Sequence, residues 1–109
     1  MYNGLWTIEF WSTLGRFGSG VLVLNNGRLL GGDAGHYYSG FYRIENNIIK
    51  GQANIVRFDP NSVSVIGDFD NYSLDFKGRI DEHYIEADAT HSINALLGIK
   101  LKGYKKAEM

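Results

Sequence analysis

Apolar and polar residues alternate along most of this sequence, and the alternation is strictest between residues 72 and 80. The apolar side of that segment consists of Tyr72, Leu74, Phe76, Gly78 and Ile80, and the polar side consists of Ser73, Asp75, Lys77 and Arg79. Successive side chains of a β-strand point to opposite faces of a sheet, so the pattern predicts a strand with one buried face. Any fold of this chain must therefore cover one face of a sheet.

The same pattern predicts about eight strands joined by short connections. They lie near residues 4–11, 20–24, 28–30, 37–44, 48–58, 72–80, 84–90 and 97–104. Asn25-Asn26-Gly27 and Asn46-Asn47 are typical of tight hairpin turns, because Asn and Gly tolerate a positive φ. Residues 14–19 are predicted to form a loop, and residues 62–71 either a short strand or an ordered loop. No connection is long and helical enough to join parallel strands, so the sheet is predicted to be antiparallel.

The length of 109 residues is typical of one domain. Most strands have one polar face, so a single sheet face is buried. Closing the sheet into a barrel buries that face and removes its exposed edges. We therefore predict an all-β fold, a single antiparallel barrel of roughly eight strands over residues 1–104, followed by a disordered tail at 105–109. A sandwich of the same strands is the alternative.

The predicted inward face combines large aromatic residues with glycine and alanine. The core is predicted to contain Trp6, Phe10, Leu74, Phe76, Ile85, Ile99 and Leu101. Two interpretations follow: the small residues lie opposite the large ones in a filled barrel, or they surround a vacant pocket for a small apolar ligand. Such a pocket is predicted to be lined by Trp6, Phe10, Tyr38, Tyr42 and Phe76.

The composition offers little for catalysis. The chain has no cysteine, which excludes disulfides, thiolate metal sites and cysteine nucleophiles. His36, His83 and His91 are predicted to be polar surface residues. The glycine-rich segment 31–35 precedes a predicted strand rather than a helix, so it is predicted to be a turn and not a phosphate site. We therefore expect a non-enzymatic protein without catalytic residues, metal or cofactor.

The charge and hydropathy restrict the partners. Eleven basic residues nearly balance twelve acidic ones, so no nucleic-acid-binding surface is indicated. No apolar run approaches the roughly 18 residues that a membrane helix needs. The first residues show no secretion signal, and the expected location is the cytoplasm.

One part of the predicted outer surface is too apolar for solvent. Residues 20–24 are apolar on both faces, and Trp11 points outward from its predicted strand. Apolar residues on an outer surface often mark an interface. Trp11, Val21 and Val23 are therefore predicted to form a homodimer surface, with partial cover by the glycine-rich loop as the alternative.

Four segments occur in the order GLWTIEF (4–10), GSGVLVLNNG (18–27), GGD (31–33) and YSGFY (38–42). Together they resemble the bacterial GrlR family of negative regulators of type III secretion gene expression. The resemblance covers roughly residues 3–104 and implies a lipocalin-like, eight-stranded barrel that dimerises. It also implies a partner, a helix-turn-helix transcriptional activator, recognised through an exposed Glu-Asp-Glu-Asp run. The matching turn here is Glu45-Asn46-Asn47, in which only Glu45 is acidic.

Two functional hypotheses follow from these observations. The first is a regulatory protein that acts through protein–protein contact, resembling a repressor of a transcriptional activator. The alternative is a carrier or sensor that holds a small apolar ligand inside the barrel. A filled interior favours the first hypothesis, and a closed apolar cavity of several hundred Å³ favours the second.

Overall fold

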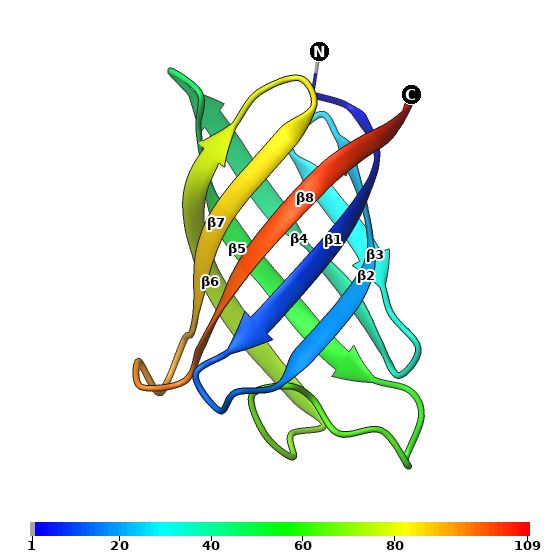
Figure 1. Ribbon diagram of the computed structural model, residues 1–109, viewed down its shortest axis with the longest axis vertical. Coiled ribbons are helices and arrows are strands. Elements are labelled where there is room, and N and C mark those ends of the chain that lie inside the picture. The colour runs from blue at the N-terminus through cyan, green and yellow to red at the C-terminus, as the bar shows by residue number, and fades with distance from the viewer. Residues whose placement is uncertain (1) are drawn as a thin grey trace.

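A computed structural model describes residues 2–109 as one closed barrel of eight antiparallel strands. The strands are β1 (Gly4–Ser12), β2 (Phe17–Asn25), β3 (Arg28–Gly32), β4 (His36–Glu45), β5 (Ile48–Arg57), β6 (Asn71–Ile80), β7 (Tyr84–His91) and β8 (Gly98–Glu108). Each strand pairs with its neighbours in sequence, and β8 pairs with β1 to close the barrel (Figure 1). The predicted antiparallel barrel is confirmed, and the sandwich is excluded.

The two ends of the barrel differ. Tight turns after β2, β4 and β6 lie at the end that also holds both termini, which we call the turn end (top of Figure 1). The connections 13–16, 33–35, 58–70 and 92–97 lie at the opposite end, which we call the loop end. Asn26, Gly27, Asn46 and Asn47 all have positive φ, as the two-residue hairpin turns require.

The last strand is longer than the sequence pattern predicts. Residues 105–108 belong to β8, and the backbone there pairs with β1, placing Ala107 opposite Leu5 and Glu108 opposite Gly4. The prediction of a disordered tail at 105–109 is therefore wrong for these residues. The charged side chains Lys105 and Glu108 form an ion pair at 2.9 Å within this ordered strand.

The structure changes one predicted strand boundary and decides between the two alternatives for residues 62–71. β2 begins at Phe17, which pairs with Trp11, so residues 17–19 are strand and not loop. Of residues 62–71, residues 62–70 form an ordered loop and Asn71 begins β6. A single bridge joins Ser64 to Gly67, and Ile66 is almost completely buried among the core residues.

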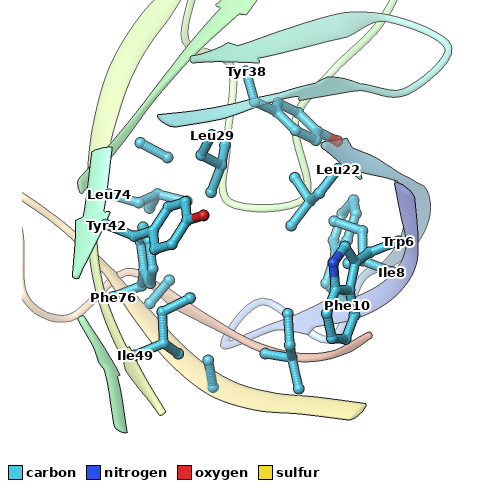
Figure 2. Packing of buried hydrophobic residues seen from close by; sticks show 14 of the residues in the cluster. Trp6, Ile8, Phe10, Leu22, Leu29, Tyr38, Tyr42, Ile49, Leu74 and Phe76 are labelled. Atoms are coloured by element: carbon cyan, nitrogen blue, oxygen red, sulfur yellow. The ribbon is translucent and has the colours of Figure 1, made fainter. Parts of the chain in front are cut away.

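The core consists of the inward side chains of the strands (Figure 2). Of the predicted core residues, Trp6, Phe10, Leu74, Phe76 and Ile85 are buried. Ile99 and Leu101 of β8 are partly buried and pack against the same cluster. The predicted inward placement of these core residues of β1, β6, β7 and β8 is therefore confirmed.

Candidate functional site

The barrel encloses a cavity of about 370 Å³. Inward residues of all eight strands line it, together with residues from the loops 33–35 and 62–65. Most of the lining is aliphatic or aromatic, and Leu22, Leu29 and Leu74 point into this space (Figure 2). Phe17 and Val63 also line the cavity although 82% and 56% of their surface is exposed. The cavity therefore reaches solvent at the loop end.

Three of the five residues predicted to line a pocket do so. Phe10, Tyr38 and Phe76 line the cavity. Trp6 and Tyr42 are buried but are not among the residues that line it. The indole N–H of Trp6 donates to the backbone carbonyl of Tyr2 at 3.1 Å, which fixes the ring. Leu24, Ile49 and Ile85, which lie close to the turn end, also line the cavity, so it extends along much of the barrel.

A polar cluster lies beside the cavity mouth, where β3 passes into β4. Oδ1 of Asp33 accepts the backbone N–H groups of Gly35 and His36, each at 2.9 Å, in an Asx turn. The hydroxyl of Tyr38 donates to Oδ2 of the same carboxylate. Burial, followed by the bond to Asp33, raises the pKa of Tyr38 well above its ordinary value. The Tyr38 hydroxyl therefore remains protonated through the neutral range.

His36 is a site residue that the sequence interpretation placed wrongly. The prediction of a surface histidine is contradicted, because His36 opens β4 with its side chain inside the barrel and is only 5% exposed. Nδ1 of His36 lies 3.6 Å from Oδ1 of Asp33. Its Nε2 atom is buried and has no hydrogen-bond partner within residues 2–109. The alternation of the sequence could have indicated this burial, because residue 36 lies on the same face of the strand as residues 38 and 42.

A second polar group, on β6 and the loop before it, also lines the cavity. The hydroxyls of Ser64 and Tyr72 are 2.5 Å apart. Burial raises the pKa of Tyr72. The ring of His91 stacks on Tyr72 with a centroid distance of 5.7 Å. His91 is also buried rather than on the surface, and its Nδ1 accepts the backbone N–H groups of Ile93 and Asn94. His91 therefore has a structural role in the β7–β8 loop, and His83 is the exposed histidine.

The predicted dimer surface divides into two parts. Val21 and Val23 face outward beside Leu5 of β1 and Leu30 of β3, and this apolar outer patch is exposed or half-buried. Trp11 also faces outward, but it is remote from this patch. Thr7 is the β1 residue opposite Val21, and Trp11 lies four residues further along the strand, which is about 13 Å at ~3.3 Å per residue. Nζ of Lys102 lies 5.9 Å from the Trp11 ring centroid, which leaves that ring half-covered.

The turn Glu45-Asn46-Asn47 is exposed at the turn end. Positive φ at both asparagines explains their presence by backbone geometry. Oδ1 of Asn47 accepts a hydrogen bond from the Tyr2 hydroxyl at 3.1 Å. The turn is thus a hairpin with one acidic side chain.

Within residues 2–109, no group of three or more His, Cys, Asp or Glu side chains is arranged to hold a metal ion. The same residues contain no helix long and apolar enough to cross a membrane. No protein-family model matches the chain, and no curated protein matches it. The resemblance to the GrlR family therefore stays a prediction from sequence. Fold and site define a small antiparallel β-barrel with an interior cavity.

Proposed function

We propose that this protein binds a small, predominantly apolar ligand inside the barrel. The cavity of about 370 Å³ carries the proposal. Ligand sites of proteins span about 300–1,000 Å³ and combine an apolar lining with a few placed polar groups. The described cavity has that character, with Leu22, Leu29 and Leu74 in its wall and Asp33, His36 and Tyr38 at one side of its mouth.

Side-chain choice maintains the hollow region. Ala53, Ala87 and Ala89 line the cavity where larger apolar residues would fill it. Protein interiors are otherwise packed as densely as organic crystals, because each unfilled space forfeits dispersion contacts. An apolar ligand that enters the space supplies those contacts, and its transfer from water is favourable in proportion to the area it buries.

A matched pair of variants tests the proposal. Ala53 faces the cavity, and its neighbour Gln52 faces solvent on the same strand. We expect the unmodified protein to bind naphthalene saturably, with a change in naphthalene fluorescence. Ala53→Phe places a ring in the cavity and should abolish that binding, whereas Gln52→Phe should preserve it. Absence of saturable binding to the unmodified protein, or equal loss in both variants, would contradict the proposal.

The outer patch favours a second function, contact with another protein. Leu5, Val21, Val23 and Leu30 lie side by side on the walls of β1, β2 and β3. Contiguous apolar residues on a surface mark interaction sites. We propose that a second copy of the chain covers this patch. Sedimentation at micromolar concentration should show a dimer that Val21→Lys converts to monomer, and a monomeric unmodified protein would refute the assignment.

Of the regulatory role that the GrlR resemblance implies, we propose only that this protein contacts another protein. One carboxylate at Glu45 gives little electrostatic steering toward a basic DNA-binding partner, since steering depends on summed charge. We therefore predict that Glu45→Lys leaves binding to any such partner nearly unchanged at low salt. A large loss at low salt that disappears at high salt would restore this turn as a recognition site.

A further inference from the structure

One side chain that lines the cavity carries a buried polar atom without a hydrogen-bond partner among the described residues. His36 faces inward, lines the cavity and is 5% exposed. Its Nε2 atom makes no hydrogen bond to any of residues 2–109. Buried polar side-chain atoms nearly always have a partner, because an unsatisfied group has lost its hydration without compensation. A ligand that fills the cavity is placed to supply the missing partner.

Asp33 determines which kind of partner Nε2 requires. Oδ1 of Asp33 lies 3.6 Å from Nδ1 of His36, and a carboxylate can only accept hydrogen bonds. This separation is too long for a hydrogen bond, but the negative carboxylate favours the neutral tautomer that carries its proton on Nδ1, which leaves a lone pair at Nε2. Asp33 is itself held by the backbone N–H groups of Gly35 and His36 and by the hydroxyl of Tyr38. A carboxylate held in one place beside Nδ1 therefore favours Nε2 as a hydrogen-bond acceptor.

The charge of the lining restricts the ligand further. The ionisable residues that line the cavity are Asp33, His36, Tyr38 and Tyr72, and no lysine or arginine is among them. A ligand carboxylate would lose its hydration and lie near Asp33 without a permanent cation to pair with it. The lining therefore favours an uncharged ligand over a fatty acid or another anionic amphiphile.

We propose that Nε2 of His36 accepts a hydrogen bond from the hydroxyl group of an uncharged, otherwise apolar ligand, a long-chain alcohol or a phenol. This inference rests on the proposed function. The cavity volume of about 370 Å³ suits on the order of a dozen heavy atoms at about 30 Å³ each, the share of one water in the liquid. The hydroxyl lies toward the mouth beside His36, and the apolar part extends into the barrel.

Three chains of similar length test the chemistry: undecane, decanol and nonanoate. Their affinities are measured calorimetrically at about pH 8, above the range in which histidine ordinarily titrates, for the unmodified protein and for His36→Leu. The affinity for decanol relative to undecane should fall roughly 2- to 12-fold in the variant, the loss of one neutral hydrogen bond. His83→Leu, the same change at an exposed histidine, should leave the ratio unchanged.

The outcomes separate this inference from the proposed function. If none of the three chains binds the unmodified protein, the proposed function fails. If undecane binds and His36→Leu does not change the decanol ratio, or if nonanoate is the ligand that depends on His36, the assignment of an uncharged hydroxyl fails.

A second measurement does not depend on the variant. Nitrogen-15 correlation spectra of the unmodified protein should show His36 as the Nδ1–H tautomer, and its Nε2 signal should move with decanol but not with undecane. An Nε2–H tautomer would overturn the assignment.

Discussion

Replacing Ala89 by leucine distinguishes a hollow barrel from a filled one through stability alone. Ala89 of β7 is buried, lines the cavity and pairs with Phe76 and Ile99. In a close-packed core, added methylenes force side chains off their rotamers and cost about 1–3 kcal/mol. In a cavity the same atoms find unoccupied space.

The expected gain follows from the added apolar volume. Leucine brings about three further methylene equivalents, and each contributes about 0.8 kcal/mol when buried. Ordering the leucine side chain costs about 0.5–1 kcal/mol. The free energy of unfolding should therefore rise by about 1.5 kcal/mol for Ala89→Leu, which corresponds to an increase in Tm of about 6–10 °C for a domain of this size.

Urea unfolding followed by tryptophan fluorescence measures this change, because Trp6 is fully buried in the folded barrel. Ala107→Leu is the matched control, since Ala107 lies on β8 with its side chain exposed. That control should stay within about 0.5 kcal/mol of the unmodified protein. A loss of more than about 1 kcal/mol for Ala89→Leu would refute the hollow interior.

Three further predictions concern the walls of the barrel. Phe76→Ala should lower the free energy of unfolding in urea by about 3 kcal/mol, the lower end for a buried ring because one side of it already faces the cavity; a loss below about 1 kcal/mol would mean that the ring is exposed. Gly51→Ala should destabilise the barrel by at least about 1–3 kcal/mol, because a Cβ there would collide with the carbonyl oxygen of Phe41, and a neutral effect would show that β4 and β5 are further apart. The pKa of Tyr38 is raised from 10.0, so above pH 10 the native state keeps a proton that the unfolded chain loses. The contribution of Tyr38 to the free energy of unfolding is therefore complete below pH 10 and is lost as the pH rises above it. Tyr38→Phe should therefore make the alkaline loss of stability shallower by about 1.4 kcal/mol per pH unit above that point, and an unchanged slope would contradict the burial of this hydroxyl.

The sequence determines most of the strand pattern because that information is local. In β6 and β7 the alternation of residues 72–80 and 84–90 places Leu74, Phe76 and Ile85 inside, as the structure confirms. The turns after β2 and β4 are equally local, since Asn-Gly and Asn-Asn adopt positive φ without help from distant residues.

Features that depend on distant parts of the chain are not visible in this way. The charged end of β8 suggests a solvated tail, but its backbone pairs with β1, nearly a hundred residues earlier in the sequence. His36 is buried because the barrel closes around it and Asp33 faces its ring. Whether alanines at positions 53 and 89 face large side chains or open space depends on the summed volume of all inward residues, which no single segment contains.

Methyl NMR tests the central claim, a hollow interior that accepts an apolar ligand, most directly. Undecane is titrated into protein labelled at the leucine methyl groups. Leu22, Leu29 and Leu74 line the cavity, whereas Leu5 and Leu30 face outward. We predict saturable shifts of the three inner leucines with the two outer ones unmoved. Shifts confined to Leu5 and Leu30, or no saturable shift at all, would contradict the binding of an apolar ligand inside this barrel.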